Sequence, residues 1–167
     1  QLSQLVKRLD DGSPEAIRRA AVLTLSRHYH ATWAGNSSQA LDLAQEAARL
    51  AQSCGDQAIE AEALLRCGQE LWTQGRLDAA QSILVEGYAK AMAANLPALA
   101  AVSLERQAQV QMFAGGSAAR ISGILTESLR LYEEAGSEIG VSEILNKLGY
   151  LPLAQGDGDY AEALAHF

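Results

Sequence analysis

The stretch that decides the fold is residues 57–95, QAIEAEALLRCGQELWTQGRLDAAQSILVEGYAKAMAAN. In its first half apolar residues recur at intervals of four: Ile59, Ala63, Cys67 and Leu71. This is the period of an α-helix and not the alternation of a β-strand. Gly75 and Asn95 interrupt the pattern, and both residue types tolerate the left-handed backbone conformation that ends many helices. The stretch therefore predicts two antiparallel helices joined by a short turn.

The same punctuation recurs along the chain in two interleaved series. One series, at intervals of 40, 40 and 41 residues, is Gly35, Gly75, Gly115 (or Gly116) and Gly156; the other, at 40 and 41, is Gly55, Asn95 and Gly136. Candidate N-caps mark the helix starts: Ser13, which is followed by Pro14 and Glu15, and also Asn36 and Ser117. The spacing predicts helices near 2–10, 14–33, 37–53, 57–74, 77–94, 98–114, 118–135, 139–154 and 159–167.

A single helical hairpin of this length cannot cover its own apolar stripe, so each hairpin must stack on its neighbour. We therefore expect an all-α fold, a right-handed α-solenoid of stacked antiparallel hairpins. Residues 1–12 are expected to be the last helix of a preceding repeat. About four hairpins follow, at 13–55, 56–95, 96–136 and 137–167, the last one incomplete. On this interpretation the chain is a segment of a longer array.

Composition excludes several classes of function. The 167 residues are 49% hydrophobic and 20% charged, and no apolar stretch approaches the ~18 residues of a membrane span. The formal net charge of −7 is not the basic footprint that direct nucleic-acid binding requires. Cys54 and Cys67 form no C-x-x-C pair, which is typical of reduced thiols in a cytoplasmic protein and implies neither a disulfide nor a zinc framework.

Few residue patterns suggest catalysis or metal binding. His28 and His30 are two residues apart, so a helix places them on different faces, and we interpret them as a surface or half-buried pair. The glycine-rich turns lack the lysine of a phosphate loop and the spaced acids of a calcium loop. Trp33 and Trp72 lie near turns, and the interpretation we favour is that each seals a hairpin junction. We expect a non-catalytic protein without metal or cofactor.

Two units resemble the tetratricopeptide repeat family in their residue pattern. The unit at 56–95 carries Leu64, Cys67-Gly68, Leu71, Gly75, Ala80, Leu84 and Gly87, with Cys67 in place of the usual leucine and Gly87 in place of the second-helix alanine. The last unit carries Leu145, Leu148-Gly149, Gly158-Asp159-Tyr160, Ala163 and Phe167, and departs from the pattern at Pro152 and in the turn extension Gly156-Asp157. The period of 40 is longer than the family's usual length of about 34 residues. This long repeat is similar to the arrays of large bacterial transcriptional regulators, in which an ATP-binding domain precedes the repeats and a DNA-binding domain follows them.

The resemblance implies a concave groove lined by the first helix of each repeat. Its groove-facing positions are Val22, Ser26, Tyr29, Trp33; Glu62, Arg66, Gln69, Thr73; Val102, Arg106, Gln109, Phe113; Glu143, Lys147, Tyr150 and Ala154. The binding candidates among them are Tyr29, Trp33, Arg66, Gln69, Arg106, Gln109, Lys147 and Tyr150. Arg66, Arg106 and Lys147 form a ladder of cations that could hold an acidic segment. The alternative is a solvated face with local ion pairs such as Glu62 with Arg66.

The leading hypothesis is a cytoplasmic scaffold that binds a protein or peptide, within a bacterial signalling or transcription-regulatory protein. One alternative is a sensor that binds a small effector in the groove, and another is a structural spacer. A buried pocket lined by Tyr29, Trp33 and Gln69 would favour the sensor, and an open polar groove would favour the peptide binder. No direct contact with nucleic acid or membrane is expected.

Overall fold

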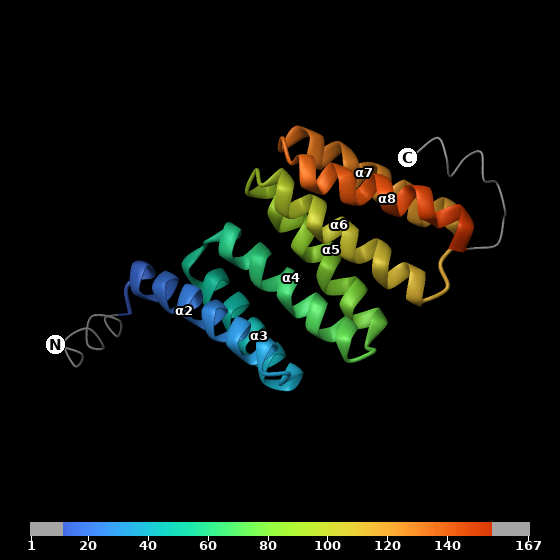
Figure 1. Cartoon of the computed structure of the whole chain (residues 1–167). Helices are drawn as coiled ribbons and strands as arrows, with labels where there is room; N and C mark the ends of the chain where they lie inside the picture. The colour runs from blue at the N-terminus through green and yellow to red at the C-terminus, as the bar shows by residue number, and fades with distance from the viewer. Residues whose placement is uncertain (1–11, 155–167) are drawn as a thin grey trace.

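The computed structural model describes residues 12–154 of the chain. Within that range it contains helices and no strands (Figure 1). The helices are α2 (Pro14–Trp33), α3 (Ser37–Cys54), α4 (Gln57–Thr73), α5 (Leu77–Ala93), α6 (Pro97–Phe113), α7 (Ala118–Glu134) and α8 (Glu138–Ala154). Each bound lies within one residue of the predicted helix. The helices predicted at 2–10 and 159–167 fall outside the described residues.

The signals that predicted the helix ends act as expected. The side chains of Ser13, Asn36 and Ser117 accept hydrogen bonds from the backbone N–H groups of the first turns of α2, α3 and α7. The predicted punctuation residues within the described range are all left-handed, with φ between 55° and 74°: Gly35, Gly55, Gly75, Asn95, Gly115 and Gly136. Gly156 lies outside that range. These residues reverse the chain without the steric penalty that a side chain would meet there.

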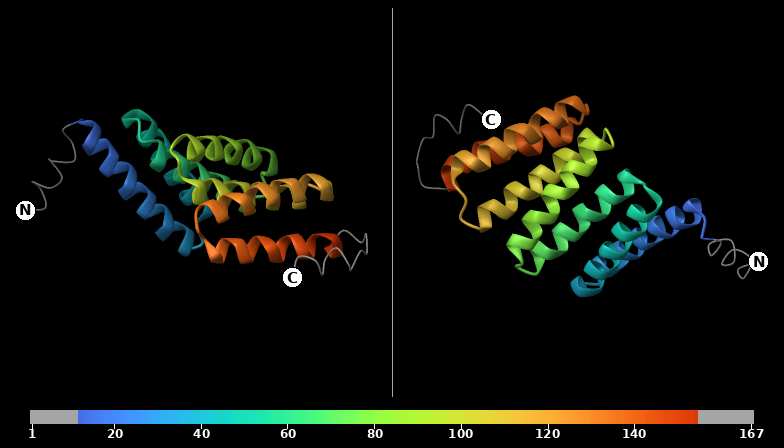
Figure 2. Two further views of the ribbon diagram at one scale, coloured as in Figure 1. Left: turned by 90° about the horizontal axis from the view of Figure 1, so that it is seen from above. Right: turned by 180° about the vertical axis from the view of Figure 1, so that it is seen from behind.

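From α2 to α8, consecutive helices pack against one another, and the helices follow in chain order from α2 at one end of the stack to α8 at the other (Figures 1 and 2). Beyond its neighbours along the chain, α4 also contacts α2 and α6. The first helices of successive hairpins therefore lie near one another. This arrangement confirms the all-α solenoid of stacked antiparallel hairpins.

Small residues set how closely the helices approach. Alanines of α3 are fully buried: Ala40, Ala44, Ala47 and Ala51. A Cβ built on Gly68 would lie 2.5 Å from the side chain of Leu84, which is itself fully buried. Gly68 thus leaves room for the side chain of Leu84 in α5. A Cβ built on Gly87 would lie 3.3 Å from Leu64 Cβ and 3.5 Å from the backbone nitrogen of Leu65, both in α4.

The prediction that both tryptophans seal hairpin junctions is wrong for Trp33. The side chain of Trp33 is 89% exposed. Trp72 is half-buried and packs against the apolar cluster that contains Leu71 and Leu84. The repeat period explains the difference, because 40 residues after Trp33 stands Thr73 and not Trp72. A shift of one residue turns a side chain by about 100° around the helix axis, so the two tryptophans point in different directions.

Candidate binding groove

Two hollows lie on the surface formed by α2, α4, α6 and α8, and we call this surface the groove. The larger hollow, about 760 Å³, lies mainly between α6 and α8 and is lined by Glu105, Arg106, Ala108, Gln109, Met112, Phe113, Leu125, Glu143, Asn146, Lys147 and Tyr150. The smaller, about 290 Å³, is lined by His28, Tyr29, Thr32, Arg66, Gln69, Glu70, Trp72, Thr73 and Arg106. Arg106 borders both.

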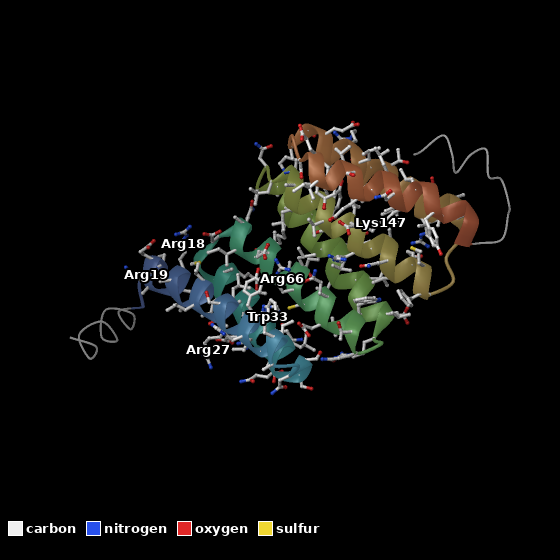
Figure 3. All side chains as sticks on the ribbon, viewed as in Figure 1. Arg18, Arg19, Arg27, Trp33, Arg66 and Lys147 are labelled. Atoms are coloured by element: carbon white, nitrogen blue, oxygen red, sulfur yellow. The ribbon has the colours of Figure 1, made fainter. Side chains whose placement is uncertain are left out.

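The structure brings most of the sequence-predicted candidates to these hollows. Arg106, Gln109, Lys147 and Tyr150 line the larger one, and Tyr29, Arg66, Gln69 and Arg106 line the smaller. Trp33 lines neither of these two hollows, because it lies at the end of α2 and is almost fully exposed. Figure 3 shows Arg66 and Lys147 on α4 and α8, far apart along the stack.

Arg66 is held by neighbours on α2 and α4. Its Nε donates to Glu62 Oε1 at 2.8 Å, and its Nη1 donates to Gln69 Oε1 at 3.0 Å. The guanidinium also lies over the ring of Tyr29, 5.0 Å from the ring centroid, and the Tyr29 hydroxyl donates to the same Glu62 oxygen at 3.0 Å. The ion pair between Glu62 and Arg66 that the sequence suggested is therefore present. Most of the charge of Arg66 is compensated within the protein.

Lys147 is paired with a buried acid. Its Nζ lies 3.0 Å from Glu105 Oε1, while the Tyr132 hydroxyl donates to Glu105 Oε2 at 3.0 Å. Glu105 is only 4% exposed, so its charge needs both partners. Burial, and then the negative charge of Glu105, raises the pKa of Tyr132 well above its ordinary value. The hydroxyl of Tyr132 therefore stays protonated and keeps donating.

Arg106 is the least neutralised cation of the ladder. Its Nη1 donates to the amide oxygen Gln109 Oε1 at 2.7 Å, and the nearest carboxylate oxygen, on Glu105, is 3.7 Å away. Within residues 12–154 its buried Nε has no hydrogen-bond partner. A guanidinium can present two parallel N–H groups to a carboxylate. Arg106 thus retains hydrogen-bonding capacity at the point where the two hollows meet.

Two exposed aromatic side chains, Phe113 and Tyr150, contribute to the apolar lining of the larger hollow, together with Ala108, Met112 and Leu125. Phe113 is 68% exposed and Tyr150 61% exposed. The Phe113 ring packs edge-on against Trp72 of α4, with centroids 5.6 Å apart and an interplanar angle of 63°. This contact between α4 and α6 orients Phe113. The hollow therefore offers apolar surface beside a cation, which suits a ligand that carries both an apolar and an acidic group.

A second buried acid, Glu70, lies at the edge of the smaller hollow. Thr32 Oγ1 donates to its Oε1 at 2.8 Å and Ser37 Oγ donates to its Oε2 at 2.9 Å. His28 Nε2 lies 3.3 Å from Glu70 Oε1, and both side chains are nearly fully buried. Burial lowers the pKa of His28, although the neighbouring Glu70 partly opposes this effect. The network ties α2 and α3 to α4.

The interpretation of His28 as a surface or half-buried residue is therefore wrong, since it is 2% exposed. His28 stands 40 residues before Gly68, in the position where the next repeat has no side chain. Three buried acids, Glu60, Glu70 and Glu105, were also not identified from the sequence. Glu60 pairs with Lys90 at 2.9 Å. For Glu105 the sequence does hold a signal, because Leu65 occupies the equivalent position one repeat earlier.

Cysteine and metal chemistry find little support in the described part of the chain. There, no group of three or more His, Cys, Asp or Glu side chains is placed to hold a metal ion. Cys54 and Cys67 are both free thiols. Burial raises the pKa of Cys67 to about 12, so its sulfur stays protonated near neutral pH. Among residues 12–154 no helix combines the length and apolarity needed to cross a membrane.

Comparison with known proteins identifies structural relatives. No family model matches the sequence, and no curated protein matches it. The fold is similar to the apo form of RapI, with a TM-score of 0.78 and 14% identity over 90% of this chain and 41% of that chain. It is also similar to BtubC from P. vanneervenii, with a TM-score of 0.77 and 20% identity over 98% of this chain and 68% of that one.

Both relatives are helical-repeat proteins. The chain spans less than half the length of RapI and about two thirds of that of BtubC. At these identities the similarity shows a shared helical-repeat fold and says nothing about a shared ligand.

Proposed function

We propose that this chain is a non-catalytic scaffold that binds a protein or peptide segment in the larger hollow of the groove. The observation that carries the proposal is the combination found there: the incompletely paired guanidinium of Arg106 beside the exposed rings of Phe113 and Tyr150. Interfaces favour arginine and aromatic side chains in this way, because they combine apolar area with directional hydrogen bonds.

The ion pairs within the groove restrict how many acidic groups the bound segment can carry. Glu62 already neutralises Arg66, and Glu105 already neutralises Lys147. A strongly acidic segment would therefore meet carboxylates as well as cations along the groove. The arrangement suits a segment with one carboxylate placed at Arg106 and an aliphatic or aromatic side chain against Phe113 and Tyr150.

Selection of peptides from a random library, followed by affinity measurement, tests this proposal. A random peptide library displayed on phage is selected on the full chain, and the affinity of an enriched peptide is measured by calorimetry. We expect Arg106→Glu and Phe113→Ala each to weaken binding by about tenfold or more, as for central interface residues.

Matched controls are available on other surfaces. Arg76→Glu changes an exposed arginine between α4 and α5, and Met92→Ala removes an exposed apolar side chain of α5. Neither should change the affinity by more than about twofold. Equal losses in the controls, or failure to enrich any peptide that competes at the groove, would count against the larger hollow as the binding site.

The smaller hollow favours a second candidate function, the sensing of a small effector. Its lining contains Tyr29 and Gln69, two of the three residues that the sequence associated with a sensor pocket, but not Trp33. Its volume of about 290 Å³ lies at the lower end for ligand sites. A small polar molecule that raises the Tm of the full chain, but not that of Gln69→Ala, would favour the sensor.

We propose a non-catalytic role because the side chains that could act as nucleophiles, acids or bases are buried or already paired. The thiol of Cys67 is buried and protonated, and the imidazole of His28 is occupied by Glu70. The three buried glutamates that we describe are each held by hydroxyl groups, by His28 or by a lysine. None of these groups is placed as a nucleophile beside an available base.

We further propose that the chain is a segment of a bacterial signalling or transcription-regulatory protein that acts in the cytoplasm. The support is the long repeat of about 40 residues and the excess of ten arginines over three lysines, which is compatible with a GC-rich bacterial gene. The full-length reading frame tests this. A nucleotide-binding motif upstream and a helix-turn-helix downstream would support the proposal, and other flanking domains would contradict it.

A further inference from the structure

Two charged side chains of opposite sign line the larger hollow without a full partner. On α6 the guanidinium of Arg106 makes one short hydrogen bond, to the amide oxygen of Gln109. On α8 the hollow is lined by Glu143, an exposed side chain whose carboxylate forms no ion pair or hydrogen bond with any residue from 12 to 154. Arg106 and Glu143 are not paired with each other either.

Comparison between repeats shows that Glu143 has lost the partner that its position normally has. On α4, Glu62 and Arg66 are four residues apart and paired, with Arg66 Nε donating to Glu62 Oε1 at 2.8 Å. Two repeat periods later the same positions on α8 hold Glu143 and Lys147. An acid four residues before a base on a helix ordinarily attracts it. On α8, however, Lys147 Nζ lies 3.0 Å from Glu105 Oε1 of α6 instead.

The burial of Glu105 explains why it takes the lysine. Glu105 is 4% exposed, and an uncompensated charge costs far more when buried than when exposed to water. The equivalent position on α2 is Leu25, so Arg66 meets no buried acid on that helix and stays with the acid of its own helix. Lys147 thus compensates the buried acid, and the exposed acid of α8 is left over.

The converse holds on α6, which lacks the acid of this pair. Val102 stands 40 residues after Glu62, four residues before Arg106. Arg106 therefore has no carboxylate one turn away on the groove face of its own helix, and the nearest carboxylate oxygen, on Glu105, is 3.7 Å away. The larger hollow thus receives a cation without its acid from α6 and an acid without its cation from α8.

An aromatic ring accompanies each of these charges. Phe113 follows Arg106 by seven residues and Tyr150 follows Glu143 by seven, so each ring lies on the same helix face as its charge. A tyrosine ring attracts an ammonium or guanidinium group, and the aliphatic stem of a basic side chain can lie along apolar surface. The volume of about 760 Å³ is large for a ligand site and leaves room for both kinds of contact.

We propose that the segment bound in the larger hollow carries a basic side chain as well as an acidic one. The acid pairs with Arg106 on α6, and the lysine or arginine pairs with Glu143 on α8 and lies against the ring of Tyr150. This inference rests on the proposed function and adds to it the charge pattern of the partner. A segment with acidic residues alone would leave Glu143 unpaired and would be repelled by it.

The probes that test this are synthetic peptides with acetylated and amidated ends. Each carries one glutamate, one phenylalanine and one lysine among serines and glycines, and the glutamate and lysine are separated by two to eight positions, about 7 to 27 Å in an extended chain. Calorimetry measures their affinity for the full chain. At the best separation, norleucine in place of lysine keeps the aliphatic stem and removes the charge, and should weaken binding about three- to tenfold.

Variants at Glu143 show whether this residue is the partner of the peptide lysine. Glu143→Gln should weaken the lysine peptide by the same factor and leave the norleucine peptide within about twofold, because the interaction it removes is already absent there. Glu143→Lys should reverse the preference, so that a peptide with a second glutamate in place of the lysine binds more tightly than the lysine peptide.

Glu86→Gln is the matched control. Glu86 is exposed on α5, lines neither hollow of the groove and forms no ion pair with another of the residues 12–154. The substitution removes the same charge as Glu143→Gln. Both peptides should bind this variant within about twofold of the unchanged chain, and a loss equal to that in Glu143→Gln would show unspecific attraction and overturn the proposal.

The outcomes separate this proposal from the proposed function. If Arg106→Glu weakens the peptides but the lysine and norleucine peptides bind equally, the hollow binds an acidic segment without a basic side chain, and only this proposal is overturned. The same holds if Glu143→Gln strengthens both peptides, since Glu143 would then pair with Arg106 in solution. If no peptide binds, or if binding depends on neither residue, both proposals fall.

Discussion

Lys147 Nζ lies 3.0 Å from Glu105 Oε1, 42 residues away in the sequence, and so joins α8 to α6 at the edge of the larger hollow. This relationship changes the role expected of the cation ladder. Lys147 compensates the buried charge of Glu105 and is not free for a partner. Arg66 is likewise engaged, because it pairs with Glu62. Arg106 is left as the cation on which a ligand carboxylate in the groove would most depend.

The hydrogen bond from Tyr132 to Glu105 should contribute measurably to stability. Tyr132→Phe removes a donor from a nearly fully buried carboxylate, and we expect the free energy of unfolding to fall by about 1–3 kcal/mol. Tyr150→Phe is the control, because Tyr150 is 61% exposed. Urea denaturation of both variants measures the difference, and equal stabilities would contradict the role given to Tyr132.

Two helical glycines should respond to alanine in opposite directions. A Cβ at Gly68 would lie 2.5 Å from Leu84, whereas one at Gly123 of α7 would meet nothing within 4 Å. Gly68→Ala should destabilise, since overpacking of about 1–3 kcal/mol exceeds the gain in helix propensity of about 1 kcal/mol. Gly123→Ala should stabilise by about 0.5–1 kcal/mol. Thermal unfolding monitored by circular dichroism distinguishes the two, and a stabilised Gly68→Ala variant would show that Leu84 can move aside.

His28 should make the stability depend on pH. The pKa of histidine in an unfolded chain is about 6.5, and burial lowers the pKa of His28 in the folded chain despite the opposing charge of Glu70; Arg66 lowers it further, and Glu62 opposes. Folding therefore favours the neutral imidazole. The contribution is complete above about pH 6.5 and is lost as the pH falls towards the folded pKa.

The measurement compares Tm at about pH 7.5 and pH 5 for three proteins. The unchanged chain and the His30→Gln variant, whose substituted side chain is exposed, should lose more Tm on acidification than His28→Gln. Carboxylates titrate in all three proteins, so the comparison isolates His28. An identical pH dependence in the three would exclude His28 as its source.

The second helices of the first two hairpins, α3 and α5, differ in whether a side chain caps their N-terminus. Asn36 accepts a hydrogen bond from the backbone N–H of Gln39, but Arg76, at the same place in the next repeat, makes no side-chain cap. Arg76→Asn should therefore stabilise the chain by about 1 kcal/mol, and Asn36→Ala should destabilise it by a similar amount. Chemical denaturation of the two single variants checks both signs. An unchanged free energy of unfolding in Arg76→Asn would mean that the backbone at residue 76 does not allow the cap.

Much of the candidate groove could be predicted from the sequence because a fixed repeat carries one helix face into register with the next. Arg66, Arg106 and Lys147 fall on that face by periodicity alone. Trp33 was assigned to it by the same rule, and its side chain projects into solvent beyond both hollows. Periodicity states which side of a helix a residue occupies, but not whether a neighbour lies opposite.

The sequence by itself determined the helices, their ends and the order in which they stack, because local hydrogen bonding, glycine conformation and the spacing of apolar residues act within a few residues of the chain. Only the tertiary structure decided which charges are buried and with which partner. His28 with Glu70, and Glu105 with Lys147 and Tyr132, are brought together from distant segments. Pairing of that kind depends on the distance between helices, which no local pattern encodes.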